Sequence, residues 1–113
     1  MIRIEAVWLA VGVSDLRGGI DRLLGQVIGR FGAAQPHHAY VFANRRATRL
    51  KVLVFDGAGM WLCTRRLQQG GFAWRQDEGA AVRLSAQQWD WLVAGRPWQR
   101  RAAAARAEAI RVI

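Results

Sequence analysis

The feature that most constrains the fold is a β-type segment that ends in a tight turn. Val52-Leu53-Val54-Phe55 is a continuous run of branched and aromatic residues, and Asp56-Gly57 directly after it is a turn signal. A second extended segment, residues 60–67, follows the turn. Pairing of Phe55 with Met60 would fix the antiparallel register, because a slip of one residue moves every side chain to the other face. The sequence therefore predicts a β-hairpin at the centre of the fold.

This register divides the side chains of the hairpin between two faces. The face that we expect in the core holds Leu50, Val52, Val54, Trp61 and Cys63. The opposite face holds Arg49, Lys51, Thr64 and Arg66 beside Leu53, Phe55, Met60 and Leu62. That second face is basic at the end near Asn44 and apolar at the end near Asp56. We interpret it as a contact surface, with the alternative that a helix covers its apolar end.

Basic residues are concentrated in and around this hairpin. The chain of 113 residues has 17 Lys and Arg against 8 Asp and Glu, a net charge of +9. Seven of the 17 lie between residues 45 and 75, where only Asp56 opposes them: Arg45, Arg46, Arg49, Lys51, Arg65, Arg66 and Arg75. The planar guanidinium group of Arg can donate two parallel hydrogen bonds to a phosphate. This clustering predicts DNA binding through backbone phosphates. The expected contacts are Arg45, Arg46, Arg49, Lys51, Arg65 and Arg66.

A helix is expected between a short N-terminal strand and the hairpin. Residues 6–11 form an apolar run that indicates a buried strand, and Ser14 or Asp15 is the expected helix cap. Apolar residues then recur at helical spacing from Leu16 to Phe31, and Gly32 ends the pattern. Glycines inside a helix are unfavourable, so we interpret Gly18, Gly19, Gly25 and Gly29 as possible points of close approach to another backbone.

Further short elements are expected on both sides of the hairpin. Residues 40–43 begin the meander, residues 72–75 would form a fourth strand and residues 82–84 a fifth, and Ser85 would cap a second helix that ends at Gly95 to Pro97. The resulting fold class is α+β: a small antiparallel β-meander sheet packed by an N-terminal amphipathic helix and a second, C-terminal helix. We expect one domain over residues 1–97, and an Ala- and Arg-rich tail over residues 98–113 that is either a marginal helix or disordered.

Five of the six tryptophans divide into two groups according to where we expect their side chains. Core packing is favoured for Trp8, Trp61 and Trp89, whereas Trp74 and Trp98 are candidates for exposed contacts with a partner.

The sequence argues against an enzyme, a metalloprotein and a membrane protein. The eight carboxylates form no convincing two-metal set, and Ser14, Ser85 and Cys63 have no evident base beside them, so we expect no enzyme and no catalytic residue. Adjacent His37 and His38 would point to different sides of an extended chain, so neither a metal nor a cofactor is expected. No apolar run is long enough to span a membrane. The single cysteine suits a reducing compartment, and we expect the protein in the cytoplasm.

An ordered series of short motifs resembles a known family. The series is Asp15-Leu16-Arg17-Gly18-Gly19-Ile20-Asp21, then 41–46 (VFANRR), 49–57 (RLKVLVFDG), Trp61-Leu62 with Arg65-Arg66-Leu67, and Gly71-Phe72-Ala73-Trp74. It is similar to the TnpB accessory proteins, the second open reading frame of the sixty-six class of bacterial insertion sequences, over roughly residues 6–96.

The resemblance implies an accessory factor for transposition whose element encodes a larger, separate transposase. It leaves the molecular role open between two alternatives. The protein either binds DNA through the arginine-rich hairpin or is an adaptor that holds the transposase of the same element. Its expected partners are therefore DNA and the other transposition proteins of the element, with no membrane.

Overall fold

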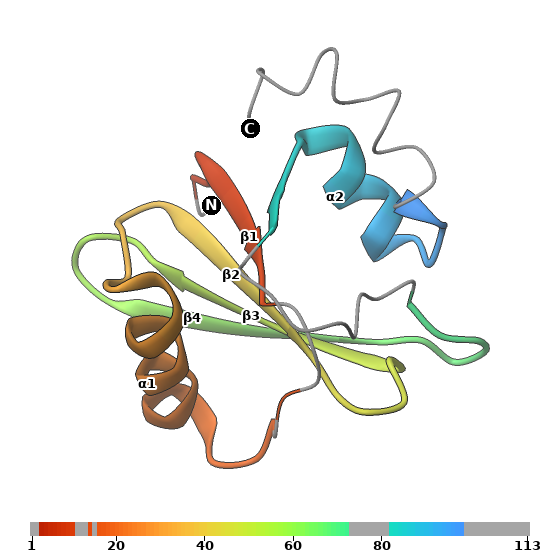
Figure 1. Cartoon of the computed structure of the whole chain (residues 1–113), viewed down its shortest axis with the longest axis horizontal. Coiled ribbons are helices and arrows are strands. Elements are labelled where there is room, and N and C mark those ends of the chain that lie inside the picture. Colours follow the sequence, from red (N-terminus) through yellow and green to blue (C-terminus); the bar gives the residue numbers. More distant parts are fainter. Residues whose placement is uncertain (1–2, 11–13, 15, 73–81, 99–113) are drawn as a thin grey trace.

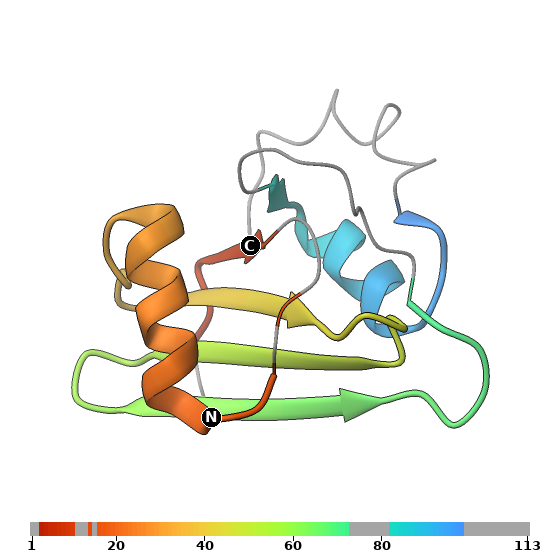
Figure 2. The same cartoon turned by 60° about the horizontal axis from the view of Figure 1, so that its bottom comes forward.

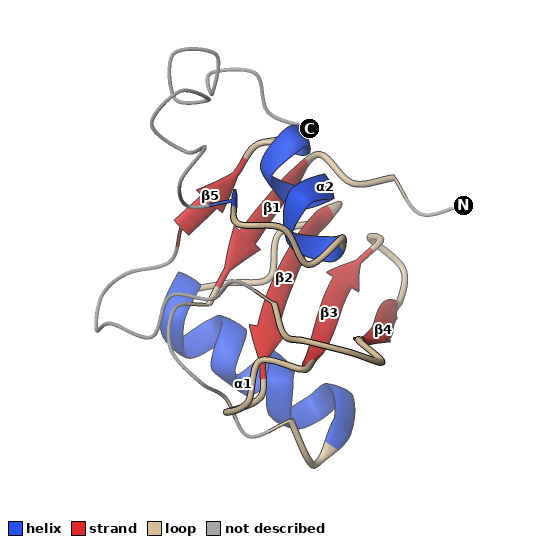
Figure 3. Cartoon of the chain, turned by 90° about the vertical axis from the view of Figure 1, so that its right-hand side faces the viewer, coloured by secondary structure: helices blue, strands red, loops and turns tan. Residues whose placement is uncertain are grey.

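Five strands form one mixed sheet, and one helix packs against each face of it (Figures 1 and 3). The computed structural model describes residues 3–10, 14, 16–72 and 82–98. The elements in chain order are β1 (Ala6–Leu9), α1 (Gly19–Phe31), β2 (His38–Ala43), β3 (Arg49–Phe55), β4 (Met60–Arg66), β5 (Val82–Leu84) and α2 (Ala86–Val93). The strand order is β4-β3-β2-β1-β5. The expected α+β class, with a meander and two helices, is confirmed.

The meander of β2, β3 and β4 follows the predicted register. Phe55 pairs with Met60, and the ladder continues to the pair of Arg49 with Arg66. The Asp56 carboxylate closes the β3–β4 turn, because its Oδ1 atom accepts hydrogen bonds from the amides of Ala58 (2.8 Å) and Gly59 (2.7 Å). These bonds, together with one from the Trp61 indole, lower the pKa of Asp56. The sequence assignment of Asp56 as a turn residue is therefore confirmed.

Strand β1 joins the meander through a parallel pairing with β2, in which Trp8 lies opposite Tyr40. Parallel neighbours need a crossover connection, and α1 supplies it. Strand β5 pairs antiparallel with the other side of β1. As a result β1 and β2 are interior strands, and their side chains are buried except for Trp8 and His38, which are half-buried.

The core has two layers, one on each side of the sheet. One layer lies between the sheet and α2 and includes Leu50, Val52 and Val54, as predicted. The other layer lies under α1 and includes Leu53 with no exposed surface, packed with Leu23 and Val27 of the helix. The helix therefore covers the apolar end of the second face, which was the alternative left open from the sequence.

The assignment of Trp61 and Cys63 to the core was wrong. The Trp61 side chain is 49% exposed and Cys63 is also exposed. Both residues lie on β4, the outer strand of the sheet, whereas α2 contacts β5 at the opposite edge. Helix α2 reaches this face of β4 at Arg65, whose Nε atom donates to the Val93 carbonyl, and it leaves Trp61 and Cys63 exposed. The indole Nε1 of Trp61 donates to Asp56 Oδ2 at 2.7 Å, which ties the ring to the hairpin turn.

The start of α1 also differs from its prediction. The helix begins at Gly19 behind Gly18, whose φ of 92° is left-handed, and no side chain caps it. Ser14 is not the cap, since its buried hydroxyl has no hydrogen-bond partner among the described residues. Its amide instead donates to the Ala43 carbonyl of β2 at 2.9 Å. Asp15 lies outside the described residues. Gly25 and Gly29 are exposed with open space beside them, so they do not mark a close backbone contact.

The C-terminal elements follow the prediction in part. Strand β5 and α2 are confirmed, and Ser85 caps α2: its hydroxyl accepts from the Gln88 amide, and its amide donates to Gln88 Oε1. Phe72 is buried but is not in a strand, and the rest of the expected fourth strand lies outside the described residues. Trp98 was expected to be exposed, which was wrong: it is 2% exposed and belongs to the core layer under α2. Residues 99–113 and Trp74 also lie outside the described residues.

Candidate nucleic-acid interface

The turn between β2 and β3 is braced by its own side chains. Asn44 Oδ1 accepts from the amides of Thr48 and Arg49, both at 3.0 Å, and Asn44 Nδ2 donates to the Thr48 hydroxyl at 3.2 Å. Ala47 is buried, has a φ of 54° and donates its amide to the Asn44 carbonyl at 3.0 Å. Arg45 and Arg46 are held between these fixed points with their side chains exposed. The turn therefore presents two guanidinium groups on an ordered backbone.

A later segment supports this turn from behind. The Phe72 amide donates to the Ala47 carbonyl, and the Phe72 ring is buried in the same core layer as Ala47. A Cβ atom at Gly71 would come within 3.1 Å of the Ala47 carbonyl oxygen. Glycine at position 71 therefore allows the chain to pass close behind the arginine-bearing turn.

Arg49 and Arg66 lie directly opposite each other on β3 and β4, at the end of the sheet next to this turn. Opposing residues in an antiparallel pair project from the same face, and like charges placed in this way are unfavourable. Both side chains are exposed. Within the described residues, Arg45, Arg46, Arg49 and Arg66 make no side-chain hydrogen bond or ion pair. We call these four residues the arginine end of the sheet.

The other two predicted contacts have partners inside the protein. Lys51 is half-buried, and its Nζ atom donates to the Leu16 carbonyl at 2.7 Å, which anchors the segment before α1. Arg65 is exposed and projects from the opposite face of β4, where its Nε atom donates to the Val93 carbonyl at 3.2 Å. That carbonyl belongs to the last residue of α2, where a positive charge is favourable. The six residues therefore do not form one continuous surface.

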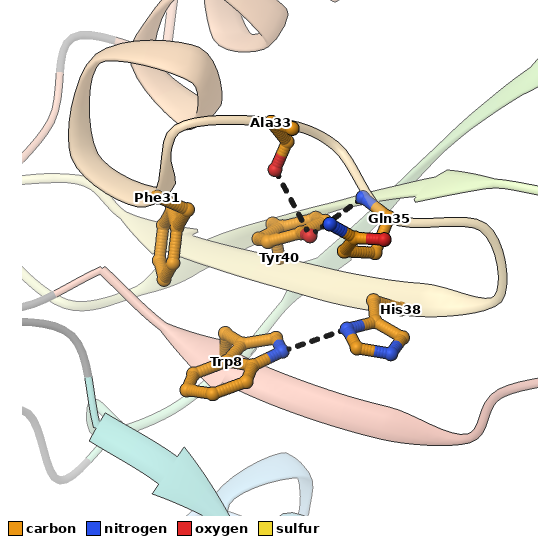
Figure 4. A pocket seen from close by; sticks show the side chains of 6 residues that line it. All are labelled: Trp8, Phe31, Ala33, Gln35, His38 and Tyr40. Atoms are coloured by element: carbon orange, nitrogen blue, oxygen red, sulfur yellow. Dashed lines mark hydrogen bonds between the residues drawn. The ribbon is translucent and has the colours of Figure 1, made fainter.

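A second feature, which the sequence did not reveal, is an aromatic pocket at the opposite end of β2 (Figure 4). It has a volume of about 330 Å³ and is lined by Trp8, Phe31, Ala33, Gln35, His38 and Tyr40. The Phe31 ring is edge-on to both Trp8 and Tyr40. The Tyr40 hydroxyl accepts from the Gln35 amide at 2.9 Å, and the Arg83 guanidinium lies 5.4 Å from the centre of the Trp8 ring. Only the pairing of β1 with β2 and the crossover of α1 bring these residues together.

His38 lines this pocket and is hydrogen-bonded to Trp8. The Trp8 indole Nε1 donates to His38 Nδ1 at 3.0 Å, so that nitrogen must carry no proton. Burial lowers the pKa of His38 below its ordinary value of 6.5, and Arg83 and His37 add to the lowering while Glu5 opposes it. His38 therefore contributes to packing and hydrogen bonding within the protein.

We expect this histidine to make the fold sensitive to mild acid. In the unfolded chain His38 takes up a proton as the pH falls through about 6.5, whereas the folded protein resists until its lower pKa is reached. The free energy of unfolding should therefore be level above pH 6.5 and should fall as the pH drops from there through the folded pKa. Thermal melts between pH 7.5 and 5 would measure the fall. His38→Gln should flatten it, and equal pH profiles for both proteins would contradict this account.

Among the described residues, no group of three or more His, Cys, Asp and Glu residues is placed to hold a metal ion. Neither described helix is long and apolar enough to cross a membrane.

Comparison with known proteins decides the family. The family model described as "IS66 Orf2 like protein" matches residues 5–103. The chain belongs to this IS66 Orf2-like family. It is thus a transposition-associated accessory protein, as the resemblance implied.

Two relatives of this IS66 Orf2-like protein occur in Sinorhizobium fredii (strain NBRC 101917 / NGR234). "Uncharacterized protein y4hO" is 35% identical over 95 residues, which cover 82% of each chain. "Uncharacterized protein y4jC" is 31% identical over 96 residues, which cover 83% of this chain and 81% of the relative. No solved structure matches.

Proposed function

We propose that this protein is a non-catalytic accessory factor that binds DNA during transposition of its insertion sequence, through the arginine end of the sheet. The observation that carries the proposal is the set of four exposed guanidinium groups without a partner among the described residues. The strand register places Arg49 and Arg66 side by side. Their positive charges repel each other, and a bound anion would remove this repulsion. A DNA backbone offers such anions in a regular row.

The contacts are expected to be with phosphates and to carry little sequence preference. The arginine end consists of a turn and two strand ends, and no described helix projects from it to enter a groove. Lys51 and Arg65 should contribute less, because each already donates to a backbone carbonyl. Arg65 also projects from the other face of β4. Binding should therefore depend mainly on Arg45, Arg46, Arg49 and Arg66.

A salt titration tests this proposal and counts the contacts. If four phosphates are neutralised, the slope of log K against log salt concentration should be about −3.6, whereas contacts from all six residues would give about −5.4. The measurement is fluorescence anisotropy with a labelled duplex between 50 and 300 mM salt, repeated on a duplex of unrelated sequence. Affinity that does not change with salt would overturn the phosphate-contact proposal.

The alternative function is an adaptor that engages the transposase of the same element. The same observation supports it, because the carboxylates of an acidic protein surface accept the forked hydrogen bonds of arginine as phosphates do. A pull-down of the element's other proteins, with and without nuclease, distinguishes the two. Retention that nuclease abolishes indicates a DNA bridge. Retention that survives nuclease, with no DNA binding in the titration, favours the adaptor.

A further inference from the structure

The outer edge of β4 has no partner strand among the described residues. Strand β4 is the terminal strand of the sheet and is seven residues long (Figure 2). Two backbone bonds fix which groups point outward: Leu67 N to Thr48 O and Asp56 N to Gly59 O, each 3.0 Å, lie at the two ends of the β3–β4 ladder. Because such bonds alternate along an antiparallel ladder, Trp61, Cys63 and Arg65 bond to β3. The outward amides and carbonyls belong to Met60, Leu62, Thr64 and Arg66.

We propose that β4 pairs antiparallel with β4 of a second copy, with the twofold axis at Cys63. All seven residues of the strand overlap only in this register. The outward-directed groups then meet in hydrogen-bonded pairs, Leu62 with Thr64 of the second copy and Met60 with Arg66 of the second copy. Long, unpaired edge strands are templates for this kind of pairing, and the two five-stranded sheets become one continuous sheet.

The distribution of charge along β4 favours this register and favours a second copy of the strand as the partner. Both arginines lie at one end of the strand and the apolar residues lie at the other. The twofold axis therefore places arginines of one copy against apolar residues of the other. Trp61, which is 49% exposed, comes opposite Arg65 of the second copy on the same face, an arrangement that suits a cation–π contact. Moving the axis to Arg65 would place the arginines of the two copies against each other and would shorten the overlap.

The register makes a specific prediction for Cys63. Its outward neighbours form the hydrogen-bonded pairs, so Cys63 and Cys63 of the second copy form a non-hydrogen-bonded pair, with Cα atoms about 4.5 Å apart. That separation lies within the range of about 4.4–6.8 Å that a disulfide can bridge. The exposed thiol should therefore be linked to its counterpart by diamide, which removes one proton and one electron from each of the two thiols.

The test uses the full-length protein at tens of micromolar. Light scattering should give twice the mass of the 12.7 kDa chain, and diamide should convert the protein to a covalent dimer on a non-reducing gel. Cys63→Ser should remain dimeric by light scattering but form no covalent dimer. A wild-type protein that is monomeric, or a dimer that diamide cannot link, would overturn the proposal.

Thr64→Pro tests the backbone pairing itself. The Thr64 amide points away from β3, so proline should leave the fold intact while it removes two symmetry-related bonds between the copies. The dimer dissociation constant should rise at least about thirtyfold, with an unchanged circular dichroism spectrum. Thr64→Val, which keeps the amide, is the matched control and should remain dimeric. A folded Thr64→Pro protein that dimerises like wild type would refute pairing through β4. None of these outcomes depends on DNA binding.

Discussion

Trp98→Ala should destabilise the protein by about 3–5 kcal/mol, the usual cost of emptying a buried aromatic site. Trp98 is 2% exposed and lies in the core layer with Leu92 of α2 and Leu84 of β5. For a domain of this size each kcal/mol lowers the melting temperature by about 4–8 °C. The loss should therefore exceed about 10 °C in a thermal melt followed by circular dichroism.

Trp61→Ala is the matched control, because the same substitution is made on an exposed ring. The indole is 49% exposed, and its Nε1 atom donates to the carboxylate of Asp56 in the adjacent turn. We expect a change in the free energy of unfolding of no more than about 1 kcal/mol. If the two variants melt together, or if Trp61→Ala is the less stable, the assignment of the two tryptophans to core and surface is wrong.

Replacing the whole arginine end with alanine should abolish most DNA binding and leave the fold intact. The variant combines Arg45→Ala, Arg46→Ala, Arg49→Ala and Arg66→Ala. If each residue neutralises one phosphate, affinity at moderate salt should fall at least about a hundredfold, equally for unrelated sequences, and the salt slope should approach zero. Stability should change by no more than about 0.5 kcal/mol per exposed side chain. Relief of the Arg49–Arg66 repulsion acts in the stabilising direction.

A second variant with the same loss of charge shows whether DNA binding depends on this surface or only on the net positive charge of the protein. Both variants remove four of the positive charges that contribute to the net charge of +9. The control positions are exposed and lie on other elements: Arg3, Arg22, Arg30 and Arg96. Fluorescence anisotropy should show near wild-type affinity for the control. Equal losses in the two variants would mean that charge alone drives binding. A variant of the arginine end that melts well below wild type would mean that this end of the sheet is structural.

Local sequence signals were sufficient for much of the fold. The run Val52 to Phe55, followed by Asp56-Gly57, specified both the hairpin and its register, because a turn and the strands beside it are governed by residues close in the chain. Ser85 marked the start of α2 for the same reason. The exposure of Arg45 and Arg46 also followed from their place in a polar turn.

Burial was decided by the tertiary structure. Trp61 lies between Met60 and Leu62 in the sequence, whereas Trp98 follows Arg96-Pro97. Nevertheless Trp61 is exposed on an edge strand, and Trp98 belongs to the core layer under α2. Likewise, Lys51 looked like a free cation until the segment before α1, 35 residues earlier in the chain, placed the Leu16 carbonyl beside it. The sequence alone determined which residues form the hairpin and how they pair. Which of its side chains remain available to a partner depends on the elements that pack over them, and that packing brings together residues far apart in the chain.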